Sequence, residues 1–234
     1  MIKIVKKIYK DSLAIFFFLI MSFVLSAVTI NVYAFDDGYT VLVRKLKNIN
    51  TFEADFTQEV SNCKKETINT IKGKLYISKP NQFYWESNSG FEATLISDGK
   101  YLWSYDADLE QAIRKPLKKA LASSVFNFLL GDAEKLRDNF ELVDIEVIDC
   151  SEGEYCINKQ KVCYMLKPKN SLKSECKHLM LCFTGDTLVS FRVHSLLDQH
   201  TELHFNIIKQ NKYIPQTRFK FSAPDYVDII TTES

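Results

Sequence analysis

A period of two in the order of apolar and polar residues dominates this chain and restricts the folds open to it. Phe52, Ala54 and Phe56 alternate with polar residues in TFEADFTQEV, and the alternation returns after residue 139 in FELVDIEVID, VCYMLKP, HLMLCFT, TLVSFRVHS, TELHFNIIK and TRFKFS. Successive side chains of a strand point to opposite faces, so this pattern predicts half-buried strands. Roughly ten or eleven strands with short connections predict a mostly antiparallel, strongly curved sheet.

Two glycine-containing pairs mark tight turns between predicted strands. Asp98-Gly99 joins two strand-like runs, and this pair is what a type I′ hairpin turn requires. Gly185-Asp186 marks a second tight turn. The sequence shows no internal repeat, low-complexity stretch or interdomain linker, so a single domain is expected.

Two segments change to helical periodicity. Residues 36–50 begin with Asp36 or Asp37, which suit a helix start, and continue with apolar residues at helical spacing, namely Val41, Leu42, Leu46 and Ile49. Residues 115–132 are more apolar and end at Gly131, with helical spacing of Leu117, Leu121, Val125, Phe128 and Leu129. The sequence therefore predicts one amphipathic helix before the strands and a second between the early and later strands.

The first 34 residues have the parts of a secretory signal peptide. Four lysines precede an apolar run over 13–28, and Val32 and Ala34 occupy the −3 and −1 positions of a signal-peptidase site. An uncleaved membrane anchor is the alternative, since about 16 apolar residues fall just short of a span. The small residues favour cleavage after Ala34, which would release an exported, soluble domain over 35–234. No cysteine precedes Cys63, so the chain has no lipobox of its own.

The charge of the exported part argues against a nucleic-acid partner. Removing residues 1–34 takes four lysines and one aspartate from 30 basic and 29 acidic residues, which leaves 26 and 28 and a net charge of about −2. Phosphate binding needs clustered lysine and arginine, which a near-neutral surface does not favour.

All six cysteines lie in the exported part, at Cys63, Cys150, Cys156, Cys163, Cys176 and Cys182. An even number in an oxidising compartment predicts up to three disulfides. The spacings contain no C-x-x-C and fit no standard zinc pattern. Hairpin geometry suggests two mutually exclusive cross-strand pairs, Cys163–Cys182 or Cys150–Cys163, and the sequence does not choose between them.

No motif in the sequence points to catalysis or to a cofactor. His200 and His204 have the spacing of helical metal ligands, but they lie in a strand pattern, where residues four apart are about 13 Å apart. Ser123-Ser124 lacks the G-x-S-x-G elbow, and seven glycines form no phosphate-binding loop. What remains is an aromatic-rich curved sheet with amphipathic helices, which fits a carrier for an apolar ligand or a plain packed β-domain equally well.

Several ordered motifs resemble the periplasmic outer-membrane lipoprotein carrier family, LolA. They are FEADFTQEV, GKLYISKPNQFYWES, LISDGKYLWSYDADLEQA and ALASSVFNFLLGD, which run with little gap from Leu42 to Leu130. Family members show F-x-A-x-F-x-Q, then G-x-L-x-[VI]-x-[RK]-P-x-x-F-x-W, then V-S-D-G-x-x-L-W-x-Y-[DN]. Fainter agreement continues in YMLKPK and RFKFSAPDYV.

The resemblance implies a mainly β (α+β) fold, an incomplete antiparallel β-barrel of about eleven strands with an apolar cavity under a lid of short helices. It implies a monomeric, soluble periplasmic chaperone without enzyme activity or cofactor. Such carriers take a triacylated lipoprotein from an inner-membrane ABC exporter and deliver it to an outer-membrane receptor. The alternative function is a periplasmic module on the same fold that senses lipid or lipoprotein and signals to another protein.

The resemblance also implies which residues line the cavity, although each remains equally compatible with ordinary core. They are Leu46, Ile49, Phe56, Leu75, Phe83, Trp85, Leu95, Trp103, Phe126, Phe128 and Leu129. The family's basic residue before the proline, usually arginine, is Lys79 here, and its implied role is a polar contact near the lid that restrains closure. Lysine keeps the charge but lacks the bidentate fork of arginine. The six cysteines are a second departure from the family.

Overall fold

The computed structural model describes residues 37–89, 93–120, 127–131, 133–149, 160–170 and 176–232. These residues belong to one of the two compact units of the chain, Asp37–Ser234. The expected signal peptide and its cleavage after Ala34 lie outside the described residues. Among the described helices, none has the length and apolar character needed to cross a membrane.

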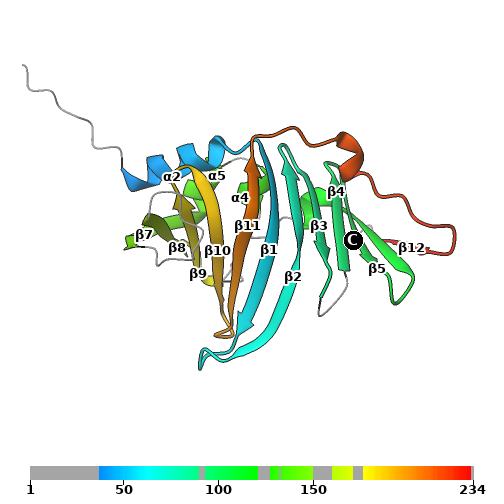
Figure 1. Cartoon of the computed structure of the whole chain (residues 1–234), viewed down its shortest axis with the longest axis horizontal. Helices are drawn as coiled ribbons and strands as arrows, with labels where there is room; N and C mark the ends of the chain where they lie inside the picture. Colours follow the sequence, from blue (N-terminus) through cyan, green and yellow to red (C-terminus); the bar gives the residue numbers. More distant parts are fainter. Residues whose placement is uncertain are drawn as a thin grey trace, which may run out of the picture. The chain divides into compact units, whose positions relative to one another are not determined.

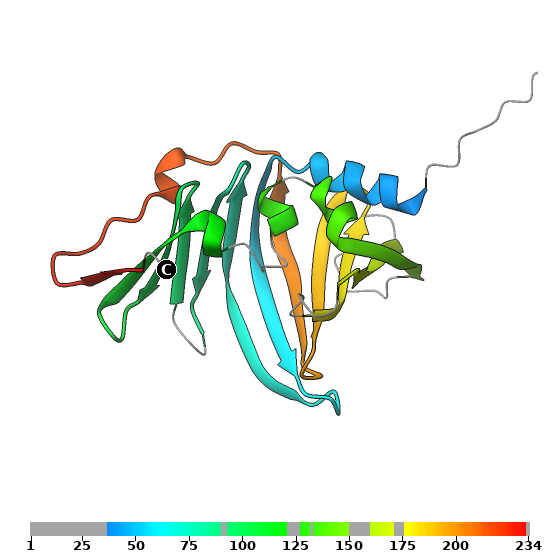
Figure 2. The ribbon, with the colours of Figure 1, turned by 180° about the vertical axis from the view of Figure 1, so that it is seen from behind.

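Twelve strands form one sheet in the order β12-β6-β5-β4-β3-β2-β1-β11-β10-β9-β8-β7 (Figures 1 and 2). Every pair is antiparallel except β12 with β6. The terminal strands β12 and β7 do not pair with each other within the described residues, so the sheet stays open. This confirms a mainly β fold with an incomplete, curved barrel. The strands are β1 Thr51–Ser61, β2 Thr67–Ser78, β3 Gln82–Ser87, β4 Ala93–Asp98, β5 Tyr101–Asp106, β6 Gln111–Pro116, β7 Phe140–Asp149, β8 Gln160–Pro168, β9 Cys176–Thr184, β10 Thr187–Ser195, β11 His200–Gln210 and β12 Asp228–Thr231.

The alternation in TRFKFS predicts a strand, and this prediction is wrong. A 3₁₀ helix, η2 (Gln216–Phe219), occupies the first half of the segment and follows Pro215. Phe219 is buried, and the Arg218 guanidinium lies over the rings of two tyrosines, at 4.7 and 5.5 Å from their centroids. The apolar positions therefore anchor a helical turn to the sheet. The short strand β12, which follows further along the chain, has exposed residues throughout and no alternation that would reveal it.

The hairpin between β4 and β5 is confirmed, but its turn is not type I′. A type I′ turn needs positive φ at both central residues, which are Gly99 and Lys100 in this hairpin. Gly99 has φ +95°, whereas Lys100 is not in the left-handed region. The Asp98 carboxylate accepts hydrogen bonds from the backbone N–H groups of Lys100 and Tyr101, at 2.8 and 2.7 Å. Glycine is thus needed at the first central position, as in a type II′ turn.

The second predicted tight turn is also confirmed. Gly185-Asp186 connects β9 and β10, and Gly185 has φ +55°. The Lys45 ammonium donates hydrogen bonds to the Gly185 carbonyl oxygen at 2.6 Å and to the Asp186 carboxylate at 2.8 Å. The turn is therefore attached to the first helix of the domain.

The first predicted helix is confirmed as α2 (Gly38–Lys47). The side chain of Asp37 accepts a hydrogen bond from the Thr40 N–H at 2.6 Å, which caps the helix. That hydrogen bond also holds the pKa of the Asp37 carboxyl below its usual value. Leu42, Val43 and Leu46 form the buried stripe of the helix.

The second predicted helix, over 115–132, is only partly correct. Lys115 and Pro116 end strand β6, and the helical segments described here are α3 (Leu117–Ala120) and α4 (Asn127–Leu130). Residues 121–126 lie outside the described part of the chain. A further short helix, α5 (Lys135–Asn139), is not predicted by the sequence, because five residues are too few to show helical periodicity.

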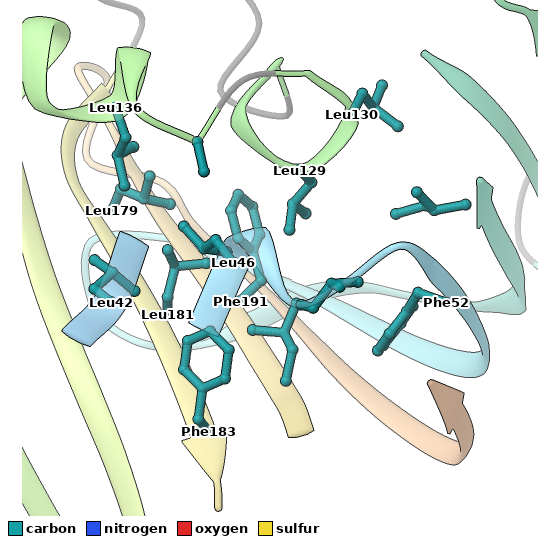
Figure 3. Close-up of a cluster of buried hydrophobic side chains, with 14 of the residues drawn as sticks. Leu42, Leu46, Phe52, Leu129, Leu130, Leu136, Leu179, Leu181, Phe183 and Phe191 are labelled. Carbon is teal, nitrogen blue, oxygen red and sulfur yellow. The ribbon is translucent and has the colours of Figure 1, made fainter. Parts of the chain in front are cut away.

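The helices cover one face of the sheet, which we call the inner face (Figure 2). In Figure 3, Leu42 and Leu46 of α2 and Leu136 of α5 point toward Leu179, Leu181 and Phe183 of strand β9. All six side chains are buried, and Leu129 and Leu130 of α4 belong to the same cluster. Burial of each such side chain contributes about 1.5–3 kcal/mol, so this layer supplies much of the stability.

One disulfide joins two strands of the sheet. Cys163 of β8 and Cys182 of β9 are direct cross-strand partners and are bonded. This selects one of the two alternatives from the sequence and excludes Cys150–Cys163. Cys63 is exposed with a free thiol, so one cysteine at least is not paired. Cys176 is buried at the start of β9, and Cys150 and Cys156 lie outside the described residues.

The disulfide should stabilise the sheet substantially. It closes a loop with a sequence separation of 19 residues, which corresponds to about 3 kcal/mol in the chain-entropy model. We therefore expect the Cys163→Val, Cys182→Val double variant to lose about 3 kcal/mol of unfolding free energy, measured by urea titration. Cys63→Ser is the matched control and should leave the urea midpoint unchanged. An equal midpoint for wild type and the double variant would contradict the expectation.

Candidate functional site

The inner face of the sheet has a closely packed part and a half-exposed part. Strands β1 and β8–β11 contribute fully buried side chains beneath α2, α4 and α5, including Phe56, Phe183, Phe191 and Phe205. On β3–β6 the inner-face apolar side chains are only half-buried, namely Phe83, Trp85, Leu95, Leu102 and Ile113. The second group therefore offers apolar surface that the protein's own side chains leave partly uncovered.

Strand register places the half-buried residues on the same face as the core. Ile77 of β2 pairs with Phe83, and Phe83 pairs with Ser97. In the next row Leu75 pairs with Trp85, and Trp85 pairs with Leu95. Cross-strand partners share one face of a sheet, so two continuous rows run from the packed core into the half-exposed region.

Phe56 and Trp85 join the two parts of the inner face. Their rings stack with centroids 3.8 Å apart. A Cβ on Gly73 would lie 2.6 Å from the Phe56 ring and 1.9 Å from the Glu86 carbonyl oxygen, so only glycine leaves room for this stack. Phe56 is 2% exposed, whereas Trp85 is half-buried. The stack thus forms the boundary between core and the open surface.

Most of the predicted cavity residues lie on the inner face. Buried in the core are Leu46, Ile49, Phe56, Leu75 and Leu129, and half-buried on the open part are Phe83, Trp85 and Leu95. Phe126 lies outside the described residues. Phe128 lies in α4, but its side chain is outside the described part of the structure. The structure thus brings eight of the predicted residues together around one face.

Trp103 lies on the opposite face, which corrects the prediction. It pairs with Ile96, whose partner Tyr84 belongs to the outer row, and its ring stacks on Phe221 at 5.0 Å. The Arg114 guanidinium lies 5.5 Å from the same ring. Leu102, one residue earlier, occupies the inner face instead and packs against the core cluster. Strand alternation shows that Leu102 and Trp103 lie on opposite faces of β5, but it does not show which of the two faces is the inner one.

Lys79 is a half-buried cation between the sheet and α2. Its Nζ donates a hydrogen bond to the Leu46 carbonyl oxygen at 2.7 Å, in the last turn of the helix. A cation is favoured there by the helix dipole. Burial lowers the pKa of Lys79 from 10.5 to about 8, since no carboxylate in the described residues forms an ion pair with it.

The turn that contains Lys79 also binds a second helix. The Asn81 N–H donates to the Leu130 carbonyl oxygen at 2.9 Å, at the end of α4. The Ser97 hydroxyl donates to the Asn81 carbonyl oxygen at 2.7 Å, which fixes the turn to strand β4. The turn between β2 and β3 therefore connects α2, α4 and the sheet through three specific hydrogen bonds.

His200 and His204 have the spacing of helical metal ligands in the sequence. Within the described ranges, no group of three His, Cys, Asp or Glu side chains is arranged to bind a metal ion. His200 and His204 pair with Ser61 and Thr57 and lie on the outer face, away from the apolar surface.

Comparisons with known proteins agree with this geometry. The family "Outer membrane lipoprotein carrier protein LolA" matches residues 47–222. The outer-membrane lipoprotein carrier protein of Hahella chejuensis is 31% identical over 193 residues, covering 82% of this chain and 88% of that protein. The protein of the same name from Pseudomonas putida strain KT2440 is 29% identical over 217 residues, covering 93% and 98%.

A solved structure supports the fold independently. An uncharacterized conserved protein of Thermus thermophilus is similar with a TM-score of 0.51 and 13% identity, covering 82% of this chain and 97% of that one. At this identity the likeness concerns the fold alone. The sequence match over three quarters of the chain, together with the open apolar face under short helices, shows that this chain belongs to the LolA family of outer-membrane lipoprotein carrier proteins.

Proposed function

We propose that this protein carries the acyl chains of lipoproteins on the half-exposed inner face of β3–β6, beneath α3 and α4. The observation that carries the proposal is that apolar rows run from the packed core to the half-buried Phe83, Trp85 and Leu95. Leu102 and Ile113 lie further along the same two rows, beyond Ser97 and Ser104. Methylene groups laid on this surface would complete its burial. Packed-core residues such as Leu46 and Phe56 would then form the buried core next to the site.

The energetics require a carrier that covers its cargo incompletely. One acyl chain of roughly 15 methylenes is stabilised in lipid by on the order of 12 kcal/mol. A soluble carrier must replace much of that burial and still release the chain. Helices that pack on the same surface when it is empty compete with the acyl chains, which keeps the net affinity moderate.

The proposed direction of transport follows from the family. The cargo would be a triacylated lipoprotein received from an inner-membrane ABC exporter, and the acceptor would be an outer-membrane receptor. The carrier would act in the periplasm as a monomer in a one-to-one complex, after cleavage behind Ala34. N-terminal sequencing of the exported protein would test that cleavage, with Phe35 expected as the first residue.

Co-purification tests the proposal directly. When the exported protein and a triacylated lipoprotein are expressed together, we expect an equimolar complex in the periplasmic fraction. The same lipoprotein with its modified cysteine changed to serine carries no acyl chains and is the matched control. Equal capture of both forms would overturn the acyl-binding proposal.

Lys79 is proposed to restrain the lid through its bond to the end of α2. Because its pKa is lowered in the folded state, the unfolded chain binds more protons between about pH 8 and 10.5. The free energy of unfolding should therefore rise with pH across that window, and the cost of the buried charge should be fully present below it.

Lys79→Met should raise the free energy of unfolding at pH 7 and remove the alkaline rise. Lys79→Arg keeps the cation and is the matched comparison; it should keep the low stability at pH 7 and lose the rise, since arginine does not titrate there. Urea titrations between pH 7 and 11 measure both. A wild-type stability that falls across the window would contradict the expected sign.

A further inference from the structure

We infer that the two hairpin turns at the end of the sheet remote from α2 form a docking surface for an anionic membrane. We call this surface the tip; it comprises the β1–β2 turn with Lys64 and Lys65, Ile68 at the start of β2, and the β10–β11 turn with Leu196 and Leu197. The turns are neighbours because Ser61 of β1 pairs with His200 of β11. Figure 1 shows both turns at the same end of the sheet, opposite α2.

The tip exposes large aliphatic side chains where hairpins ordinarily carry small polar residues. Leu197 is 85% exposed, Leu196 47% and Ile68 55%. Three large hydrophobic side chains on adjacent hairpins make a compact apolar surface of the kind that enters a lipid interface.

The leucines are not needed to hold their turn. The Ser195 hydroxyl oxygen accepts hydrogen bonds from the N–H groups of Leu197 and Gln199, at 3.2 and 3.1 Å, and the Ser195 N–H donates to the Gln199 carbonyl oxygen at 2.8 Å. Asp198 takes the left-handed conformation that the turn needs, with φ +58°. The backbone is thus fixed by polar residues, while the leucine side chains project into solvent.

The second turn presents cations in the same way. The Asn62 side-chain oxygen accepts hydrogen bonds from the N–H groups of Lys64 and Glu66, at 2.9 and 3.0 Å. Lys64 and Lys65 are exposed, and no ion pair with either occurs among the described residues. The carboxylate of Glu66, in the same turn, accepts a hydrogen bond from the Asn62 side-chain amide at 2.8 Å. The two lysine ammonium groups, beside three aliphatic side chains, then complement an anionic lipid surface.

Three histidines extend the charge of the tip when the medium is acidic. His178, His194 and His200 form one cross-strand row on the outer face, with ring centroids 6.1 Å and 4.1 Å apart. Burial and the neighbouring His194 lower the pKa of both His178 and His200. His178 and His200 therefore gain positive charge at a lower pH than an ordinary histidine does.

The strands and turns beside the histidine row carry further charged side chains. Asp198 accepts from His194 Nε2 at 3.1 Å and also pairs with Lys177. The other charged neighbours include the cations Lys167, Lys65 and Arg192. They also include the carboxylate of Glu202, which pairs with Arg192 and has Glu59 as its cross-strand partner. Within the two turns Lys64 and Lys65 balance Glu66 and Asp198, so protonation of the histidines gives the tip its net positive charge.

Vesicle sedimentation tests this surface with the exported protein. We expect binding to vesicles of phosphatidylethanolamine and phosphatidylglycerol, weakened by salt and strengthened as the pH falls from neutral to acidic. Leu196→Ser with Leu197→Ser should lower the partition coefficient about tenfold or more. Lys64→Gln and Lys65→Gln should lower it about fivefold each. Leu109→Ser, which alters a 70% exposed leucine in the β5–β6 turn, is the matched control and should bind like wild type.

Other outcomes of the experiment would overturn the inference. Equal binding to phosphatidylcholine vesicles would exclude the electrostatic part, and unchanged binding of the double-leucine variant would exclude the apolar part. A dimer that dissociates in that variant would assign the tip to a second copy of the chain. The tip is separate from the proposed acyl site: Phe83 pairs with Ile77, which pairs with Phe52, and Phe52 lies about 30 Å along β1 from Ser61 at the tip. Phe83→Glu should therefore still bind vesicles, which distinguishes failure of one proposal from failure of the other.

Discussion

Phe83→Glu should abolish lipoprotein capture while leaving a folded protein. Phe83 lies half-buried on the inner face, between Ile77 of β2 and Ser97 of β4. A carboxylate there would lose its hydration whenever an acyl chain covered the strand, and such a charge has no partner in hydrocarbon. We expect the affinity for the lipoprotein to fall about hundredfold or more, since each 1.4 kcal/mol of binding free energy changes the affinity tenfold. The measurement is the amount of lipoprotein that co-purifies from the periplasm.

Tyr84→Glu is the matched control for this variant. It places the same charge one residue further along β3, on the outer face, where the Arg218 guanidinium lies 5.5 Å from the Tyr84 ring. Cargo capture should remain near that of wild type. Circular dichroism and the urea midpoint should show that both variants are folded. If Phe83→Glu were unfolded, Phe83 would belong to the essential core; if it were folded and still bound cargo, the inner face of β3 would not be the acyl site.

Phe56→Ala should have the largest effect on stability among the inner-face positions. Phe56 is 2% exposed, stacks on Trp85 at 3.8 Å and packs against the backbone at Gly73. Truncation of a buried phenylalanine removes its transfer free energy and leaves a cavity, which together cost about 3–5 kcal/mol. Urea titration should show this as a lower midpoint with an unchanged slope.

The comparison with Phe83→Ala separates core from binding surface. Phe83 is already partly exposed in the absence of cargo, so its truncation should cost roughly 1–2 kcal/mol. Val60→Ala, on the same strand as Phe56 and half-buried, controls for the effect of changing β1 itself. Equal losses for Phe56→Ala and Phe83→Ala would contradict the division of the inner face into a packed and a half-exposed part.

The sequence predicts where the strands and helices lie along the chain better than it predicts which face of the sheet each side chain occupies. Period-two alternation correctly identifies the strands on both sides of the helical region, and Asp37 is confirmed as a helix start. In β5, however, Trp103 on one face and Leu102 on the other are both apolar. The family resemblance assigns the larger aromatic residue to the cavity, whereas Phe221 from the C-terminal segment covers it on the outer face. Alternation shows that a strand has two faces but does not show what lies against each.

The sequence by itself determined a mostly antiparallel, β-rich domain with an amphipathic helix before it, and its ordered motifs identified the family. These are local properties, because spacing along the chain fixes periodicity and turn chemistry. Only the tertiary structure decided that Cys163 bonds Cys182, that Leu102 replaces Trp103 on the inner face, and that Lys79 contacts the end of α2. Each of these depends on register or on contacts between distant segments, and strand register is set by the whole sheet.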